Sequence, residues 1–440
     1  MNHGPPALWS FLPFLGLLLA IAIFPLVHRL SHFWEKNRNK LIVALSLGAC
    51  TLLYYSVARG PAAAGHVLDH ALLKEFVPFI VLLFSLYTIA GGIFLRGDLP
   101  ATPGVNTAFL AAGSVLASLV GTTGASMLLI RPVLRTNRQR RRKVHTVVFF
   151  IFLVSNIGGC LTPLGDPPLF LGYLKGVPFW WTLRLTVPWL VASGILLVVY
   201  FVWDRWAHAR ESPADLARDD AQTQPLGLKG GRNFIYLAAV VACVATVDPA
   251  KPLPGTDWIP PAFLREGLLL VLAALSWFTT PRNREIRAAN QFNFSAIAEV
   301  ACLFAGIFIC MQAPVEFLRL EGAKLGITTP AGFFWVTGSL SSFLDNAPTY
   351  VVFFEAARAV AAGAGETGPA IPPDSLLIAV SLGAVLMGAS TYIGNGPNFM
   401  VKAIAEKSGV PMPSFLGYMA YSAAILMPTF LALTWIFFRG

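Results

Sequence analysis

The stretch TPLGDPP, residues 162–168, lies in the middle of an apolar run, and a similar stretch, TYIGNGP, fills residues 391–397 of another apolar run. Both stretches read T-x-(L/I)-G-(D/N)-x-P. Glycine and proline interrupt a helix, because glycine is flexible and proline removes a backbone donor. Paired interruptions at corresponding places in two halves of a membrane protein are typical of transporter binding sites. The two stretches therefore predict two related halves, each with a broken helix.

The composition is that of a membrane protein. Of the 440 residues, 56% are hydrophobic and 12% are charged, and the mean hydropathy is +0.66. An ordinary soluble domain carries about 25% charged residues, so this chain has too few to cover a surface that faces water. The formal net charge of +10 comes from loops between apolar runs. We therefore expect the lipid bilayer, and no nucleic acid, as a partner.

The apolar runs predict about ten transmembrane helices, since a helix needs roughly 20 apolar residues to cross a bilayer. The predicted spans are 7–27, 40–58, 75–96, 144–174, 179–203, 234–249, 263–280, 294–315, 375–405 and 414–438.

Two further apolar runs, 104–134 and 330–362, do not fit single spans. The first breaks at GTTGAS, residues 121–126, and the second at SSFLDNAP, residues 341–348. Irregular backbone at membrane depth is tolerated only inside protein or beside a water-filled cavity. Each run therefore predicts a re-entrant helical hairpin with its polar tip near the middle of the membrane.

The loop charges predict the orientation. Basic residues gather at 29–40, 131–143, 205–232 and 282–287. If the N-terminus is periplasmic and the first hairpin enters from the cytoplasm, all four clusters are cytoplasmic, as the positive-inside rule requires. If the first hairpin were a full span, the fourth cluster would lie outside. We expect a multi-pass protein of the inner (plasma) membrane.

Each half then has five full crossings and one hairpin, and an odd number of crossings inverts the second half relative to the first. The predicted fold is an all-α integral membrane protein with about ten transmembrane helices and two re-entrant hairpins in two inverted-topology repeats. The first repeat covers 1–203 and the second 234–440. Residues 204–233, the longest polar segment, are expected to form a flexible cytoplasmic linker.

Two acidic residues stand in these breaks. A charge at the centre of a membrane costs about 2.5 kcal/mol or more, so Asp166 must be solvated, paired or protonated. It is a candidate Na⁺ ligand or proton carrier, and the alternative is a cap on the helix that begins near Pro167. Asp345, at the second hairpin tip, has the same two interpretations.

Neutral polar residues accompany these acids. Amide and hydroxyl oxygens suit Na⁺ whereas helix N-termini suit anions, so the tips leave both signs of substrate open. The further candidate ion- or substrate-binding residues are Asn346, Asn156, Asn395, Asn398, Thr122, Thr123, Ser126, Thr162 and Thr391. Glu299 and the pair Lys402 and Glu406 are expected to be structural.

Three motifs carry a resemblance to a known family. SNIGG (155–159) followed by the 162–168 stretch, FLDNAP (343–348) and GNGPN (394–398) resemble the ion transporter superfamily. Within it they are most similar to NhaD-type sodium/proton antiporters and the CitMHS-like citrate transporter family. The resemblance implies a homodimer and elevator-like alternating access. Dicarboxylate members carry Ser-Asn-Thr at each hairpin tip, and this chain does not, which favours cation/proton exchange.

The predicted function is a Na⁺/H⁺ antiporter, with a Na⁺- or H⁺-coupled transporter of citrate or another organic anion as the alternative. An ion channel is a third hypothesis, but channels show symmetric pore repeats or charged rings. A membrane-embedded enzyme would need a nucleophile–base or metal constellation, which the sequence does not show. No cofactor is expected beyond Na⁺ and H⁺ as transported or coupling ions.

Overall fold

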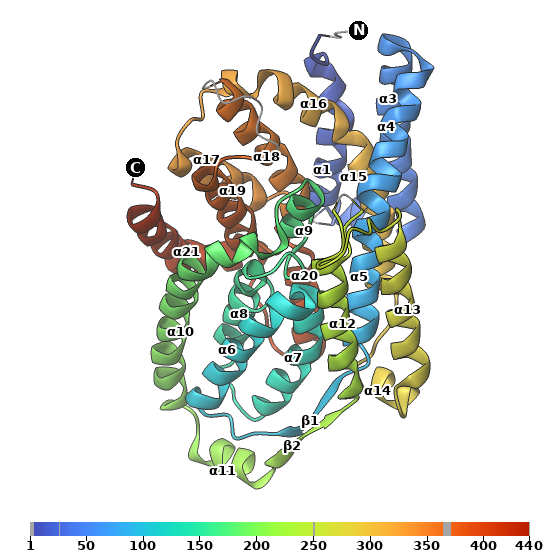
Figure 1. The fold of residues 1–440 in the computed structure, drawn as a ribbon. Helices are drawn as coiled ribbons and strands as arrows, with labels where there is room; N and C mark the ends of the chain where they lie inside the picture. Colours follow the sequence, from blue (N-terminus) through green and yellow to red (C-terminus); the bar gives the residue numbers. More distant parts are fainter. Residues whose placement is uncertain (1–3, 26, 250, 364–370, 440) are drawn as a thin grey trace.

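The computed structural model describes residues 4–25, 27–249, 251–363 and 371–439, which form helices and one pair of short strands (Figure 1). Up to the first hairpin, the elements are η1 (Leu8–Phe11), α1 (Leu12–Ile23), α2 (His28–Trp34), α3 (Asn37–Arg59), α4 (Pro61–Asp69), η2 (His70–Phe76), α5 (Val77–Ala90) and β1 (Phe94–Asp98). The elements that complete the first half are α6 (Pro103–Val120), α7 (Thr122–Thr136), α8 (Val144–Leu153), η3 (Ile157–Cys160), α9 (Pro167–Leu174), η4 (Phe179–Leu185) and α10 (Thr186–His208).

The second half begins after a short connecting region. The elements up to the second hairpin are α11 (Pro213–Ala221), β2 (Gln224–Lys229), α12 (Arg232–Thr246), α13 (Leu264–Thr279), α14 (Asn283–Ala289), α15 (Ser295–Cys310), α16 (Gln312–Glu321) and η5 (Gly322–Leu325). The last elements are α17 (Pro330–Ser341), α18 (Asn346–Gly363), α19 (Asp374–Met387), η6 (Gly388–Ser390), α20 (Gly396–Lys407) and α21 (Phe415–Phe437).

The chain is an all-α, multi-pass membrane protein. Within the described residues, five helical segments are long and apolar enough to cross a membrane, namely Asn37–Arg59, Pro61–Ala90, Pro103–Val120, Phe179–His208 and Phe415–Phe437. A sixth would be the pair α15 and α16, which bends by 41° at its break. Shorter apolar helices cover Leu8–Ile23, Val144–Cys160, Arg232–Thr246 and Asp374–Ser390. The predicted spans 144–174 and 375–405 are thus broken helices, as their glycines and prolines indicated.

The two predicted hairpins are helix pairs that turn at their polar tips. In the first, α6 ends at Val120 and α7 begins at Thr122, and Gly121 joins them with φ +83°, a conformation that favours glycine. In the second, residues 342–345 join α17 to α18. Figure 1 shows the first hairpin running toward the end of the molecule that carries β1 and β2, and the second lying toward the opposite end.

A small sheet replaces parts of a predicted membrane span and a predicted flexible linker. Strand β1 lies at the end of the span predicted at 75–96, and β2 lies within the linker predicted at 204–233. The span predicted at 75–96 stops at Ala90, and residues 94–98 form β1, antiparallel to β2. The apolar run Ile93-Phe94-Leu95 looked like a continuing helix, but the glycines at 91 and 92 end it. Asn233 then fixes the turn, because its Nδ2 donates to the Gly92 carbonyl oxygen at 2.9 Å.

The predicted flexible linker, residues 204–233, is an ordered part of the structure. Asp204 belongs to α10 and is fully buried; it accepts hydrogen bonds from Asn106 and Arg140 and pairs with His145 at 2.8 Å. The polar composition of the segment suggested that it is flexible. The hydrogen-bond partners of Asp204, however, come from distant segments of the chain and hold it in place. The segment ties the first hairpin to the rest of the molecule.

The four basic segments share one end of the molecule. Arg135 donates to the Gly97 carbonyl oxygen in β1, and Arg141 pairs with Asp215 in α11, each at 3.0 Å. At the same end Asn290, which follows α14, donates to the carbonyl oxygens of Gly91 and Ile93, near β1. Asn37 donates to the Ser295 carbonyl oxygen at 3.3 Å, which joins the 29–40 segment to the start of α15.

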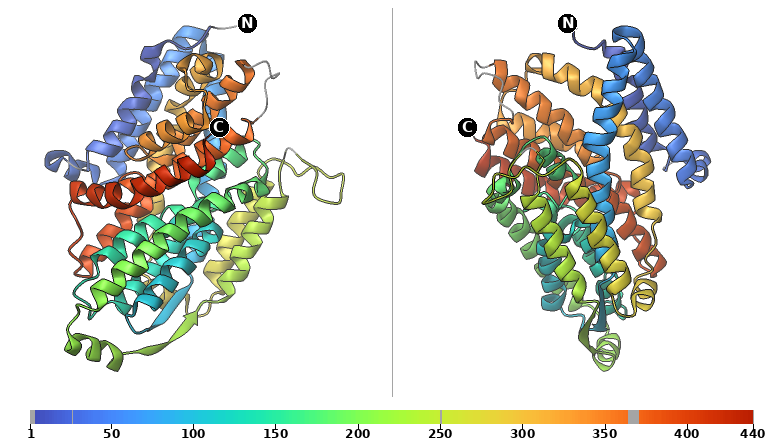
Figure 2. Two further views of the ribbon diagram at one scale, coloured as in Figure 1. Left: turned by 90° about the vertical axis from the view of Figure 1, so that its left-hand side faces the viewer. Right: turned by 45° about the vertical axis from the view of Figure 1, so that its right-hand side comes forward.

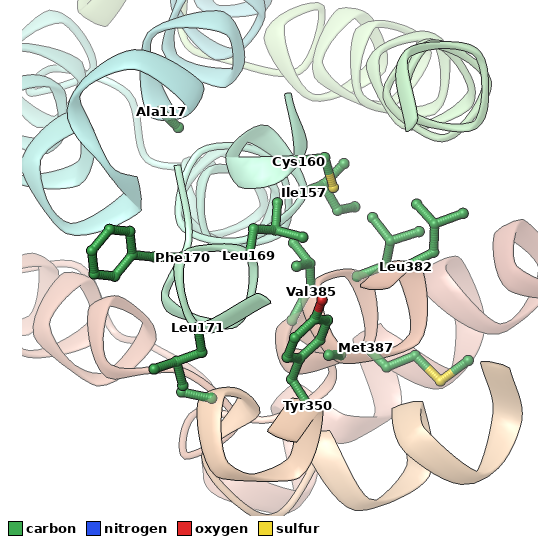
Figure 3. Packing of buried hydrophobic residues seen from close by; sticks show 14 of the residues in the cluster. Ala117, Ile157, Cys160, Leu169, Phe170, Leu171, Tyr350, Leu382, Val385 and Met387 are labelled. Atoms are coloured by element: carbon green, nitrogen blue, oxygen red, sulfur yellow. The ribbon is translucent and has the colours of Figure 1, made fainter. Parts of the chain in front are cut away.

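The core joins elements of both halves. Figure 3 shows side chains of η3 and α9 beside those of α18 and α19, including Leu169, Tyr350 and Val385. Tyr350 lies so close to α9 that a Cβ on Gly172 would collide with its hydroxyl oxygen. The final helices of the halves, α10 and α21, also pack together, and Figure 2 shows them side by side.

Candidate functional site

The side chain of Asp166 is the centre of a buried polar cluster. Asp166 is 1% exposed and precedes α9 with an extended backbone, φ −144° and ψ 142°. Its Oδ1 accepts hydrogen bonds from Thr122 Oγ1 and Asn395 Nδ2, each at 3.0 Å, and its Oδ2 accepts one from Asn346 Nδ2 at 2.6 Å. Four of the predicted site residues, from both hairpin tips and both broken helices, therefore meet at one carboxylate. We call these four residues the Asp166 cluster.

The negative charge of Asp166 has no cationic partner among the described residues. No Lys, Arg or His forms an ion pair with it within the described ranges, and its three side-chain donors are all neutral. Uncharged donors stabilise a carboxylate, but they do not cancel its charge in a medium of low polarity. A bound proton or metal cation would complete this arrangement.

Two amide oxygens beside the cluster lack partners. Asn156 Oδ1 and Asn346 Oδ1 are buried, and neither accepts a hydrogen bond from any described residue. Both amides face Gly388, where an added Cβ would lie 3.3 Å from Asn156 Oδ1 and 3.6 Å from Asn346 Nδ2. An unpaired buried acceptor usually has an unseen partner such as a water molecule or an ion. Amide oxygens next to a carboxylate are typical ligands of a hard cation.

Other predicted residues form a second ring of contacts. Asn156 Nδ2 donates to Asn398 Oδ1 at 2.7 Å, and Asn398 Nδ2 donates to the carbonyl oxygens of Gly388 and Thr391. The hydroxyls of Ser126 and Ser155 are 2.8 Å apart. Because these groups hold one another, they fix the position of the broken helices around Asp166.

The two threonines of the repeated sequence motif hold the backbone in place. Thr162 Oγ1 donates to the Ser118 carbonyl oxygen in α6, and Thr391 Oγ1 donates to the Ser342 carbonyl oxygen after α17. Each hydroxyl also accepts the amide two residues later, from Leu164 at 3.1 Å or from Ile393 at 3.2 Å. The threonines thus attach each broken helix to the hairpin of its own half.

Asp345 and Thr123, both predicted site residues, form no hydrogen bond with Asp166 in the described structure. Asp345 Oδ1 accepts the amide of Ala347 at 3.0 Å, which is the capping role considered above. The described residues show no hydrogen bond between Asp345 and Asp166, and the half-buried side chain of Thr123 forms no hydrogen bond with any of them. At the second tip it is Asn346, the next residue, that reaches Asp166.

Ser155, which together with Asn156 was expected to line the cavity, also contributes. The glycines of the breaks contribute too, although the sequence did not indicate them as site residues. The Ser155 carbonyl oxygen accepts Asn395 Nδ2 at 3.2 Å. A Cβ on Gly165 would collide with the Gly159 carbonyl oxygen, and one on Gly394 would lie 2.5 Å from the Gly388 carbonyl oxygen. The sequence does contain a sign of these close approaches, because Gly159 and Gly165 have the same spacing as Gly388 and Gly394 in the other half.

Comparison with known proteins identifies the family. A family model described as "Putative citrate transport" matches residues 4–438. The chain belongs to this family. An uncharacterized transporter of Mycobacterium tuberculosis is 26% identical over 315 residues, 68% of each chain. A 46 kDa membrane protein of Mycobacterium leprae is 25% identical over 69% of each chain, and an uncharacterized transporter of Synechocystis is 22% identical over 64% of this chain and 65% of its own.

Membership of this family makes the protein a secondary transporter and not an enzyme. Four helices of the transporter, α7, α9, α18 and α20, begin at or next to members of the Asp166 cluster. Helix N-termini carry partial positive charge. The cluster therefore combines one full negative charge with four converging positive dipole ends, so it can interact with a cation and with an anion.

A second buried acid of the transporter shows the contrast with Asp166. Glu355 in α18 is fully buried, and its carboxylate lies 3.0 Å from Lys175 Nζ, 3.0 Å from Arg358 and 3.6 Å from Arg319. Lys175 Nζ is also 3.5 Å from Glu75 Oε1. Basic side chains neutralise this acid, as is usual for buried structural charges. None of the described basic side chains does so for Asp166.

The acids and bases expected to be structural have ordinary partners. Lys40 Nζ lies 2.5 Å from Glu299 Oε1, and Lys402 Nζ lies 2.7 Å from Glu406 Oε1. These pairs agree with the prediction that Glu299, Lys402 and Glu406 support the fold.

Proposed function

We propose that this secondary transporter exchanges Na⁺ for H⁺, and that the two cations compete for Asp166. The observation that carries the proposal is a buried carboxylate held by three neutral donors, with no cationic side chain paired to it among the described residues. Such a group needs a cation in every step of a transport cycle. Na⁺ would be held by Asp166 together with the unpartnered oxygens of Asn346 and Asn156, and H⁺ would be held on Asp166 alone.

Competition at one group couples the two ions. When Na⁺ leaves, a proton neutralises the carboxylate, and the neutral acid allows the site to cross the membrane without a net buried charge. When Na⁺ binds, the proton must leave. An empty and ionised Asp166 is disfavoured by its burial, which limits crossing in that state.

The proposal includes two inverted repeats, 1–203 and 234–440, as its mechanical basis. Its support is the matching local structure of the two halves. The pair Thr162 and Ser118 corresponds to Thr391 and Ser342, and Asp166 before α9 corresponds to Asn395 before α20. A site between two such repeats can be exposed alternately to either side. The homodimer and the elevator-like motion rest on the family resemblance.

Opposite entry of the hairpins gives a topology prediction. In a cysteine-free background, cysteines are placed at Arg138, after the first hairpin, and at Thr328 and Thr256, which are exposed near the second hairpin and in the 248–262 loop. We expect Arg138→Cys to react with an impermeant thiol reagent from the cytoplasmic side only. Thr328→Cys and Thr256→Cys should react from the periplasmic side only. Reaction of Arg138→Cys and Thr328→Cys from the same side would contradict the inverted arrangement.

Cation-coupled transport of citrate or another organic anion is the second candidate. It is favoured by the family description and by the four helix N-termini around the Asp166 cluster, which suit carboxylate groups. In this case Asp166 would bind the coupling cation, and the organic anion would bind at the N-termini of the four helices.

One pair of measurements separates the candidates. Na⁺ binding by the purified protein is followed by calorimetry across pH without organic acid, and proteoliposomes are tested for Na⁺-driven pH change and for labelled citrate uptake. Competition predicts that apparent Na⁺ affinity falls as pH falls, approaching about tenfold per pH unit where one proton must leave. Anion-dependent uptake with no Na⁺ binding at any pH would refute the antiporter and favour the citrate transporter.

The same titration decides the role of Asp345. If Asp345 shares the cation site, Asp345→Asn should weaken the pH dependence of Na⁺ binding. If it only caps α18, asparagine can replace it as a cap and the pH dependence should equal that of wild type.

A further inference from the structure

A basic cavity lies at the end of the molecule that carries the small sheet. Its volume is about 220 Å³, and the residues that line it are Lys229, Gly230, Gly231, Arg232, Pro281, Arg282 and Ile286. Figure 1 shows β2, the start of α12 and the corner between α13 and α14 meeting in this region. None of the described residues that line the cavity is acidic. Three basic residues therefore border one small space.

These three charges are uncompensated. In the described part of the chain, none of Lys229, Arg232 and Arg282 forms an ion pair. Other basic residues at this end do so, for example Arg140 with Asp204 at 2.6 Å and Arg141 with Asp215 at 3.0 Å. Like charges held close together repel, so a group of this kind is expected to have an anionic partner.

The walls of the cavity are fixed by the fold. Gly230 has φ +77°, and a Cβ there would collide with the Gly92 carbonyl oxygen. Asn233 Nδ2 donates to the carbonyl oxygens of Gly92 and Gly230, and Asn233 Oδ1 accepts from Ser276 Oγ in α13 at 2.5 Å. The turn that carries Lys229 and Arg232 is thus attached both to β1 and to α13. The basic side chains are positioned by a rigid frame.

Helix α12, which starts at the cavity, and helix α13, which ends beside it, present apolar side chains outward. Ile235 in α12 is 69% exposed and Phe278 in α13 is 82% exposed, and Phe234 and Leu275 on the same helices are exposed too. In a membrane protein, such surface faces lipid chains. The basic cavity therefore lies at the boundary between a lipid-facing surface and the loops outside the membrane.

We propose that this cavity binds the phosphate group of an anionic phospholipid, whose acyl chains lie along α12 and α13. Arginine and lysine side chains bind phosphate by charge-assisted hydrogen bonds, and basic pockets at the ends of membrane helices are suited to anionic headgroups. The adjoining apolar surface distinguishes a lipid from a free phosphate, because only a lipid uses both parts. The occupant is therefore a lipid such as phosphatidylglycerol.

The test uses the full chain, delipidated in detergent. Phosphatidylglycerol or phosphatidylcholine is titrated, and bound lipid is counted by native mass spectrometry while the melting temperature is followed. The variant is K229Q/R232Q/R282Q. Its matched control is R29Q/K36Q/R38Q, which removes the same charge from exposed residues of another basic segment at the same end.

We expect wild type and the control to retain one tightly bound phosphatidylglycerol and to gain melting temperature from it. The cavity variant should bind phosphatidylglycerol on the order of a hundredfold more weakly, since each basic contact contributes about a factor of five. Phosphatidylcholine should bind all three proteins alike. Equal losses in the cavity variant and the control would overturn the proposal, as would the same stabilisation by inorganic phosphate.

Discussion

Replacing Asp166 by asparagine is expected to abolish transport in proteoliposomes while leaving a folded protein in the membrane. The side chain keeps its volume, and asparagine is as acceptable as aspartate at the position before a helix. Its new amide group would face Asn346 Nδ2, but the Asn346 side chain can rotate and accept through its unpartnered Oδ1. The fold therefore tolerates the change, whereas the charge needed for cation binding is lost. We expect the transport rate to fall about a hundredfold or more, since a charged ligand contributes about 3 kcal/mol to cation binding.

The measurement combines transport with a thermal melt of the purified protein. Glu406→Gln is the matched control, because it neutralises a carboxylate on α20 that pairs with Lys402 on the surface. Losing that pair costs about 0.3–0.5 kcal/mol, and transport should be unchanged. If Asp166→Asn transported like Glu406→Gln, Asp166 would serve only to hold the hairpin tips and the broken helices together. The Na⁺/H⁺ proposal would then fail.

The sequence predicted the breaks in the helices because their cause is local. Gly121, the 162–168 stretch and the 391–397 stretch place glycine, proline and polar side chains inside apolar runs, and no continuous helix accommodates them at membrane depth. The structure has a turn at Gly121 and helix starts at Pro167 and Gly396. Asp166 could be selected for the same reason, since one acid in an apolar run must have a special environment.

Features that depend on distant partners were not predictable in this way. The strands β1 and β2 pair across more than a hundred residues, and neither strand is distinctive by itself. Asp204 belongs to a polar segment that resembled a linker, and only its contacts with Asn106, Arg140 and His145 show that it is an anchor. Local patterns contain no information about such partners.

The second hairpin tip also shows that a local sequence pattern does not predict contacts, even for two adjacent residues. The sequence places Asp345 and Asn346 together, and the more polar Asp345 was the stronger candidate. The backbone turn decides which side chain points toward Asp166, and in the structure it is Asn346, while Asp345 receives the Ala347 amide. Charge alone therefore did not identify the residue that contacts Asp166.

Replacing Gly165 or Gly394 by alanine is expected to prevent normal folding, even though neither glycine contacts a transported ion. A Cβ on Gly165 would collide with the Gly159 carbonyl oxygen, and one on Gly394 would lie 2.5 Å from the Gly388 carbonyl oxygen. The obstacle is backbone in both cases, so no side chain can rotate away. Overpacking of this kind costs about 3 kcal/mol or more. Because Thr122 N donates to the Gly165 carbonyl oxygen at 2.8 Å, the collision would also displace the first hairpin tip.

The control for this prediction is Gly396→Ala, two residues from Gly394, where an added Cβ has no heavy atom within 4 Å. Gly396 is the first residue of α20, so alanine fits its helical backbone. Membrane yield and melting temperature in detergent should be close to wild type for Gly396→Ala and strongly reduced for Gly165→Ala and Gly394→Ala. If Gly165→Ala and Gly394→Ala were as stable as wild type, the backbone of each break would be able to move and accommodate the added Cβ. The close approach of their glycines would then contribute nothing to holding Asp166 in place.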